Sequence, residues 1–197
     1  MFKKMLMTPF LVLLASGVWA GSEIWLNPDL KGPLVDKVKW EYIPEMRIKD
    51  NGLYYLQNYL GINWSLDKSW EANLYYALKF QKSGNDWPPS NLGYIDLIYK
   101  NNPLKNRVRL EQDLSKGLLK YRESLQLKWN SWYFGEEIFF NTKYGYLDEG
   151  RSQVGYFLKL SKQAEATLGY LLRRQKSIIS SDWIWTGVLS LGAKIDL

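Results

Sequence analysis

Apolar and polar side chains alternate with a period of two along most of this chain. In the segment at residues 70–81, every second position is apolar: Trp70, Ala72, Leu74, Tyr76, Leu78 and Phe80. The positions between them include Glu71, Asn73, Lys79 and Gln81. Because successive side chains of a strand point to opposite faces, this pattern predicts a β-strand with one apolar face.

Ten segments share this alternation and are predicted to be strands: residues 38–49, 53–65, 70–81, 94–100, 104–114, 118–130, 132–141, 150–161, 163–175 and 183–197. Tight links at residues 67–68, 130–131 and 161–162 alternate with longer links at 50–52, 83–90, 144–149 and 176–181. The link at 115–117 should be long on this scheme and is short. Short turns on one side and longer loops on the other are typical of outer-membrane barrels. We therefore expect an all-β fold, an antiparallel up-and-down transmembrane β-barrel of about ten strands over residues 37–197.

Residues 21–36 precede the first predicted strand and contain Pro28 and Pro33. We expect an N-terminal arm or half-strand here, because an eleventh strand would give an odd number, which single-chain bacterial barrels avoid. A barrel of twelve strands, with one strand missed, is the alternative. Within residues 38–49, Pro44 has no N–H to donate, so we expect a bulge or a weakly paired position there.

The apolar faces could point inward, as in a soluble barrel, or outward into lipid. Ten strands with about five bulky apolar groups each would place about fifty groups inside, whereas about eight strands already leave an interior that side chains just fill. The outward direction is therefore favoured. Tryptophans near the strand ends agree with two aromatic girdles at the membrane surfaces. These girdle residues are Trp40, Trp64, Trp70, Trp129, Trp132, Trp183 and Trp185.

The first twenty residues have the pattern of a secretory signal peptide. Residues 1–4 include two lysines, residues 5–18 are mainly apolar, and Val18-Trp19-Ala20 resembles a cleavage site. Cleavage after Ala20 would leave 197 − 20 = 177 residues with a formal charge of 24 − 20 = +4. This mild excess is not gathered into a Lys/Arg block, so no nucleic-acid partner is expected.

The chain contains no His and no Cys. Their absence excludes zinc sites built on His or Cys, disulfides, a haem axial His and nucleophiles activated by His. We expect no cofactor, no metal site and no enzymatic activity. Acid–base chemistry by paired carboxylates remains the alternative, with Asp148 and Glu149 in a loop or Glu111 and Glu137 in the lumen.

The predicted inward faces carry charges of both signs. Arg107, Arg109 and Glu111 alternate along one strand, and Lys120 and Arg122 along the next. The charge network expected in the lumen consists of Arg47, Arg107, Arg109, Glu111, Arg122, Glu137, Arg151 and Arg173. Two interpretations stay open. The network either fills and stiffens a narrow interior or forms a cationic constriction that passes small anionic or sugar-like solutes.

Two acidic residues do not fit the apolar outer face. Strict alternation directs Glu123 and Glu136 toward lipid near the middle of adjacent strands. An acidic group is unfavourable at that depth. A β-bulge that turns one of them inward is the favoured explanation, and a subunit interface is the alternative.

Six stretches of the chain occur in a distinctive order: the tract from Trp25 to Arg47, Arg107-Val-Arg-Leu-Glu111, Tyr121-Arg122-Glu123, Glu137-Ile-Phe-Phe-Asn141, Arg151 followed by Gly155-Tyr156, and Gly169-Tyr170. In their order and spacing they resemble a bacterial outer-membrane β-barrel family catalogued only as a domain of unknown function. The resemblance covers most of the mature chain. It implies an exported barrel with inward side chains at Arg47, Arg107, Arg109, Glu111, Arg122, Glu137 and Arg151, and it implies no known activity.

The sequence therefore predicts a bacterial outer-membrane protein that is either a narrow passive channel or a closed structural barrel. One alternative is a barrel that binds lipopolysaccharide or mediates adhesion, for which Arg173, Arg174 and Lys176 could contact lipid phosphates. The other is a His-independent outer-membrane enzyme. The expected partners are outer-membrane lipid, lipopolysaccharide and the outer-membrane assembly machinery, and an oligomer is possible.

Overall fold

The computed structural model describes residues 23–50, 52–176 and 182–197. These residues form eleven strands: β1 (Glu23–Val35), β2 (Val38–Lys49), β3 (Gly52–Ser65), β4 (Trp70–Gln81), β5 (Pro89–Asn101), β6 (Leu104–Asp113), β7 (Leu118–Trp129), β8 (Trp132–Asn141), β9 (Tyr146–Lys159), β10 (Ala164–Lys176) and β11 (Trp183–Asp196). Within the described residues, no helix has the length and hydropathy needed to cross a membrane. The predicted signal peptide at residues 1–20 lies outside the described residues.

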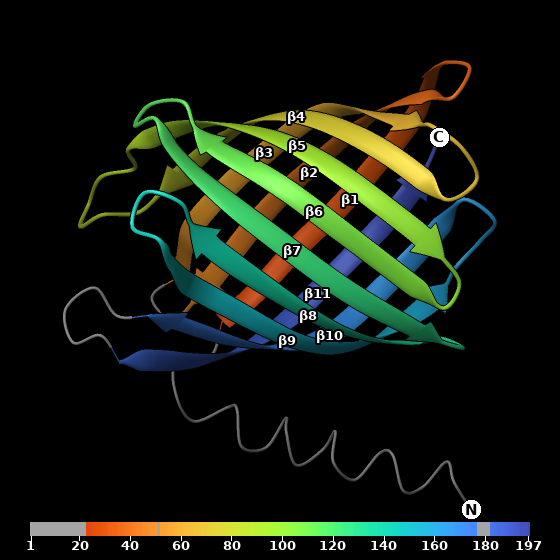
Figure 1. The fold of residues 1–197 in the computed structure, drawn as a ribbon. Coiled ribbons are helices and arrows are strands. Elements are labelled where there is room, and N and C mark those ends of the chain that lie inside the picture. Colours follow the sequence, from red (N-terminus) through yellow and green to blue (C-terminus); the bar gives the residue numbers. More distant parts are fainter. Residues whose placement is uncertain (1–22, 51, 177–181) are drawn as a thin grey trace, which may run out of the picture.

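The strands close into a single barrel in which each strand pairs with its neighbours in sequence and β1 pairs with β11 (Figure 1). Consecutive strands are antiparallel, whereas β1 and β11 are parallel, from Glu23 opposite Val188 to Lys31 opposite Asp196. An odd number of up-and-down strands requires this parallel pair, because the first and last strands then run in the same direction. The all-β, up-and-down barrel expected from the alternation is confirmed.

Residues 23–35 form a complete strand. The arm or half-strand expected at residues 21–36 is therefore wrong for these residues. β1 pairs with β11 along one edge and with β2 along the other. The expectation rested on a preference for even strand numbers. A parallel closing pair leaves no free sheet edge, and it therefore satisfies the same requirement as an antiparallel one.

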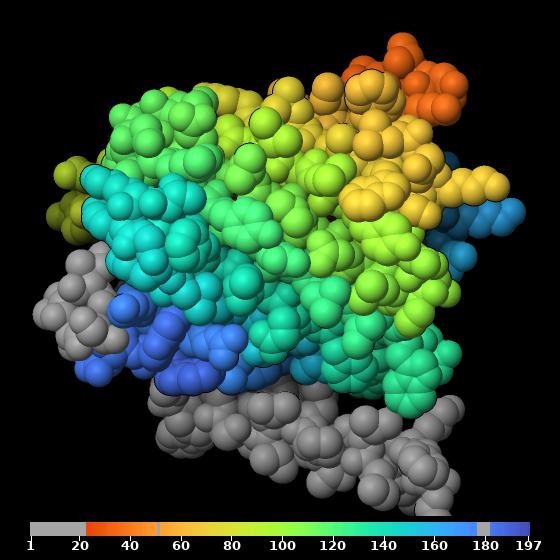
Figure 2. All heavy atoms as spheres, in the orientation of Figure 1, coloured from red at the N-terminus to blue at the C-terminus, as the bar shows by residue number. Residues whose placement is uncertain are grey.

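Apolar side chains cover the outside of the barrel, and polar side chains point into it. Leu60, Ile95 and Trp129 are 60%, 57% and 57% exposed, whereas Asp96 and Glu41 on inward positions are 1% and 2% exposed. In the space-filling view, the wall formed by β4–β7 is a continuous surface of side chains (Figure 2). The outward direction favoured by the volume of the apolar groups is the one found.

The pairing of β1 with β2 is interrupted where two prolines face each other. The two strands pair on both sides of positions 27–29 but not across them. The register is the same on both sides, which places Pro28 opposite Pro44, and neither residue has an N–H to donate. The weakly paired position expected at Pro44 is therefore present, without a bulge at that residue.

Glu123 and Glu136 both lie on the outer face. The pairing of β6 with β7 and of β7 with β8 is continuous through these residues, so the bulge favoured above is wrong. Glu123 can remain on the outer face because Tyr121 Oη and Asn106 Nδ2 donate hydrogen bonds to it at 3.1 Å and 3.3 Å. The register shifts found in the described strands fall at Pro33/Val35, Arg47/Ile48 and Phe139/Phe140.

A small hydrophobic core fills the lumen beside β3, β4 and β5. It consists of Tyr59, Tyr75, Ala77, Leu92 and Tyr94. The rings of Tyr59 and Tyr94 have centroids 5.2 Å apart, and Tyr94 Oη accepts a hydrogen bond of 2.6 Å from Gln57 Nε2. These aromatic side chains fill the part of the lumen next to β3, β4 and β5. An open, polar part of the lumen therefore lies next to the other strands.

Candidate functional site

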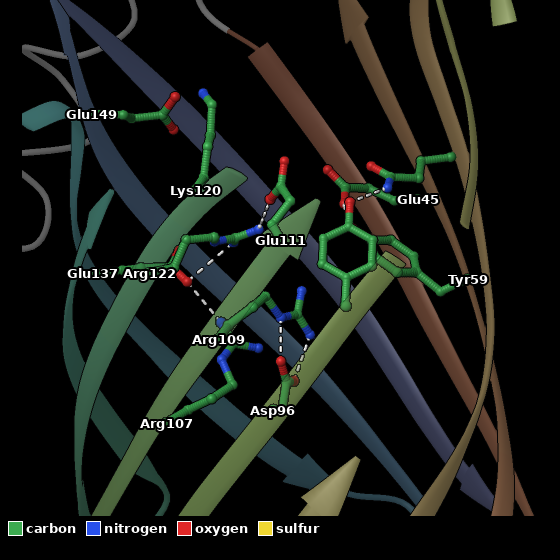
Figure 3. A network of polar contacts seen from close by, with 12 residues as sticks. Glu45, Tyr59, Asp96, Arg107, Arg109, Glu111, Lys120, Arg122, Glu137 and Glu149 are labelled. Atoms are coloured by element: carbon green, nitrogen blue, oxygen red, sulfur yellow. Dashed lines mark hydrogen bonds and ion pairs between the residues drawn. The ribbon is translucent and has the colours of Figure 1, made fainter. Parts of the chain in front are cut away.

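Charged side chains converge where β6, β7 and β8 face the lumen (Figure 3). The register places Arg109 of β6 opposite Arg122 of β7, and Glu111 opposite Lys120. Two like charges directly opposite each other on neighbouring strands are unfavourable. Each arginine therefore needs a carboxylate from another direction.

Glu137 of β8 supplies the central carboxylate. Its oxygens accept hydrogen bonds from Arg107 Nη2 at 2.6 Å, Arg122 Nη2 at 3.1 Å and Arg151 Nη1 at 3.2 Å. Arg122 also donates through Nη1 to Glu111 at 3.1 Å. We call these five residues the central belt. They come from four consecutive strands, β6 to β9, and Glu137 is only 7% exposed.

Arg109 is neutralised separately by Asp96 of β5. Its Nε and Nη2 donate two hydrogen bonds to the two carboxylate oxygens of Asp96, at 2.5 Å and 2.6 Å. The guanidinium carbon also lies 4.8 Å from the ring centroid of Tyr94. This two-point geometry fixes the plane of the guanidinium, so Arg109 forms a rigid wall beside the belt.

A second group of ion pairs extends from the belt toward β1. Glu149 of β9 accepts hydrogen bonds from Arg151 Nε at 2.6 Å and from Arg173 Nη2 at 3.1 Å. Arg173 also approaches Glu23 of β1, with a nitrogen–oxygen distance of 3.8 Å. Arg173 therefore faces the lumen, while its neighbour Arg174 faces outward. The basic cluster expected at the loop end for lipid phosphates is thus divided between the two faces of the sheet.

Arg47 lies on the opposite side of the lumen, in β2. Its Nε contacts Glu45 at 2.5 Å. The guanidinium carbon lies 3.9 Å from the ring centroid of Trp25 and 4.1 Å from that of Tyr55. Arg47 is held by cation–π contacts and one ion pair and has no direct bond to the central belt.

Two cavities occupy the lumen on either side of the belt. The loop-end cavity lies toward the barrel end that has the longer loops and has a volume of ≈ 200 Å³. The turn-end cavity lies toward the end that has the tight turns and has a volume of ≈ 250 Å³. Glu45, Tyr59, Arg122 and Arg151 line both cavities. These four side chains, two of which belong to the central belt, therefore form the boundary between the two halves of the interior.

Cationic side chains outnumber carboxylates in both cavities. The loop-end cavity is lined by Arg47, Lys79, Lys120, Arg122, Arg151 and Arg173 against Glu45, Glu111 and Glu149. The turn-end cavity is lined by Arg107, Arg109, Arg122 and Arg151 against Glu45 and Glu137. In the described part of the chain, no group of three or more His, Cys, Asp or Glu side chains could hold a metal ion. Cationic side chains therefore dominate the charged lining of both cavities.

The tryptophans expected in two girdles lie near the strand ends. Trp40, Trp64, Trp70, Trp129 and Trp132 are at the end with the tight turns, on the right in Figure 1, and Trp183 and Trp185 are at the other end. The ring of Trp70 packs against Tyr99 with centroids 5.0 Å apart, and that of Trp132 packs against Tyr156 at 5.2 Å.

The expected charge network lacks most of the acids that neutralise its arginines. These acids are Glu23, Glu45, Asp96 and Glu149. The sequence places Glu149 in a predicted loop, because Asp148-Glu149-Gly150 has the composition of a turn. In the structure Glu149 lies in β9, which begins at Tyr146 because the pairing with β8 shifts register at Phe139/Phe140. Asp96 could have been found from the sequence, because it is the one charged residue with apolar neighbours on both sides in segment 94–100. In the structure it pairs across the strands with Arg109.

A family model described as "Protein of unknown function (DUF2490)" matches residues 22–183 of this chain. Among solved structures, the chain is similar to an anion-selective porin from Comamonas acidovorans, with 12% sequence identity and a TM-score of 0.40. The match covers 84% of this chain and 56% of that chain, so this chain spans little more than half the length of the porin. No curated protein matches the chain.

Proposed function

The chain belongs to the DUF2490 family of proteins of unknown function, and we propose that it is an integral outer-membrane β-barrel that passes small anions through a narrow constriction. The outer face of the sheet supports the location, and the inner face supports the transport.

The outer face is suited to lipid. Leu60, Leu74 and Ile95 are more than half exposed at the middle of their strands, and contiguous apolar surface of this kind marks a membrane or protein contact. The closed sheet leaves no unpaired edge, as a membrane-spanning β-structure requires. With the signal peptide expected at residues 1–20, these features support export and insertion among outer-membrane lipid and lipopolysaccharide by the outer-membrane assembly machinery.

The excess of cationic over acidic side chains in both cavities carries the anion part of the proposal. An anion that enters a narrow lumen loses part of its hydration, and guanidinium groups can replace those contacts because they are weakly hydrated and carry several donors. A cation would find only carboxylates that already accept hydrogen bonds from arginine, such as Glu137 and Glu149.

Arg122 and Arg151 provide a continuous path because both line both cavities. An anion that crosses the belt can keep contact with one guanidinium until it reaches the next. Glu137 lies between these two arginines and repels the anion. Binding at the belt is thereby kept weak enough for release, which conduction requires.

Electrical recording in a planar bilayer tests the proposal. Purified barrel in a KCl gradient should show a small conductance with a reversal potential that indicates anion preference. The double variant Arg122→Gln/Arg151→Gln should move the reversal potential toward zero. Lys176→Gln removes a charge from the outer face near the loop end of β10 and is the matched control.

Two results would overturn the proposal. Absence of conductance in both the parent and the double variant would leave a closed structural barrel as the function. A preference for cations would contradict the role given to the arginines. A catalytic role, which we do not propose for this His-free chain, would appear separately as altered lipid A or phospholipid profiles upon overexpression.

A further inference from the structure

Three cationic groups in the loop-end cavity have donors without an acceptor in the protein. The Nε atoms of Arg122 and Arg173 are buried and make no hydrogen bond. Lys79 of β4 lines the same cavity and has no ion pair or hydrogen bond with any described residue. Buried N–H groups without an acceptor are rare in proteins, and two of them at one cavity indicate a site for an acceptor from solution.

The carboxylates at this cavity are already committed. Glu149 accepts from both Arg151 and Arg173, and Glu111 accepts from Arg122. No carboxylate of the described residues lies within ion-pair distance of Lys79, and Glu111 and Asp113 attract it only from longer range. The cavity is lined by six cationic groups and three acidic ones, an excess of 6 − 3 = 3 positive charges.

The positions and the space favour an anion with more than one charge. Lys79, Arg122 and Arg173 come from β4, β7 and β10, so their donors approach the cavity from three parts of the barrel wall. The volume of ≈ 200 Å³ is several times the roughly 30 Å³ that a water molecule occupies in the liquid. A chloride ion offers a single centre to donors on three different strands, whereas a small polyanion offers several separated oxygens and more than one charge to them.

We infer that the loop-end cavity is a binding site for a small polyanion, either a phosphate compound or a dicarboxylate. The inference rests on the proposed function, because it names the class of anion that would enter the pore. Lys79, Arg122 and Arg173 supply the free donors, and Arg47, Lys120 and Arg151 supply the surrounding positive potential.

Calorimetric titration of the full barrel in detergent tests the site, with inorganic pyrophosphate and succinate as the two probes in a chloride buffer. At least one probe should bind to the parent. Lys79→Gln should weaken binding by roughly tenfold or more, the loss expected for one charge-assisted hydrogen bond. Lys79→Arg, which keeps the charge, should restore most of the affinity.

Lys105→Gln is the matched control, because Lys105 is near the start of β6 at the turn end and does not line this cavity. Equal effects of Lys79→Gln and Lys105→Gln, or no heat with either probe, would overturn the site. The titration needs no membrane. A barrel that binds but does not conduct would contradict the channel alone, and one that conducts without binding would contradict the site alone.

A separate observation concerns the outer wall from β6 to β10. Glu136 lies there with a side chain that is 58% exposed, and its nearest cation is Arg174, 3.8 Å away across the face. Glu123 has hydrogen-bond donors from Tyr121 and Asn106 but no cation. An apolar groove of ≈ 340 Å³ adjoins Glu136 and is lined by Leu125, Leu127, Phe134, Val154, Tyr170 and Leu172.

This wall carries both signs of charge, which suits a self-complementary interface. In a two-fold pair the same patch meets itself, so Arg174 of each copy could contact Glu123 or Glu136 of the other. In lipid, Glu123 would keep only its two neutral donors and Glu136 only the arginine 3.8 Å away, so neither acid would have a close cation. The geometry points to a second copy of this chain as the occupant of the wall formed by β6–β10.

The natural absence of Cys allows a direct test. A single Ser152→Cys on this wall should give disulfide-linked dimers in membranes, whereas Leu74→Cys on the outer face of β4 should not. Arg174→Leu should abolish the cross-link in the Ser152→Cys background while the barrel stays folded. A monomeric mass together with no cross-link at Ser152→Cys would overturn the interface.

Discussion

Replacement of Glu137 by Gln should destabilise the barrel more than any other single charge removal in the lumen. Glu137 is 7% exposed and contacts Arg107, Arg122 and Arg151 within 3.2 Å. The amide keeps the shape but removes the charge that offsets three guanidiniums. Loss of one partner from a buried ion pair costs about 3–5 kcal/mol. The three contacts share one carboxylate and are not additive, so we expect a total within that range.

Urea unfolding in lipid vesicles, followed by tryptophan fluorescence, measures this loss. Asp196→Asn is the control, because Asp196 and its partner Lys194, 3.0 Å apart, have side chains that are 36% and 45% exposed. An exposed pair contributes about 1 kcal/mol or less. Equal losses in the two variants would refute the argument that the belt is a buried network. The same Glu137→Gln barrel should also show a stronger anion preference in bilayers, since the lumen gains positive charge.

Two further substitutions test the packing and the hydrogen-bond geometry of the lumen. Gly155→Ala should lower the free energy of unfolding by about 1–3 kcal/mol through overpacking, because a Cβ there would lie 2.3 Å from the ring of Tyr133. Gly93→Ala is the control: its Cβ would meet no atom closer than 3.8 Å, so its urea unfolding curve should be nearly unchanged. Arg109→Lys should cost about 1–2 kcal/mol because a lysine cannot make the two-point contact with Asp96; an unchanged urea midpoint would show that charge alone is sufficient.

The fold could be predicted from the sequence because the strand alternation is strong and local. Segments such as 70–81 and 132–141 coincide with β4 and β8 to the residue. β5 begins earlier than expected, at Pro89, because its first residues Pro89-Ser90-Asn91 read as a loop. The alternation predicts whether each side chain points into or out of the barrel, but it does not predict how many strands close the sheet.

The candidate site could be predicted in part, since inward positions follow from alternation alone. Arg107, Arg122 and Glu137 face the lumen at the heights that their positions in the strands imply. Their pairing could not be predicted in the same way. Which carboxylate reaches which arginine depends on the side chains that cross the lumen, and on register shifts such as the one that brings Glu149 into β9.

The strand that sequence reasoning treated as an arm contributes directly to the site. Trp25 of β1 provides an aromatic face 3.9 Å from the guanidinium carbon of Arg47 and 4.9 Å from that of Arg151. Glu23 accepts a 2.8 Å hydrogen bond from Trp25 Nε1 and approaches Arg173. An arm outside the wall could not position these side chains, because they reach the lumen only when β1 is paired on both edges. The parallel closure therefore both completes the sheet and places part of the surface that surrounds the arginines.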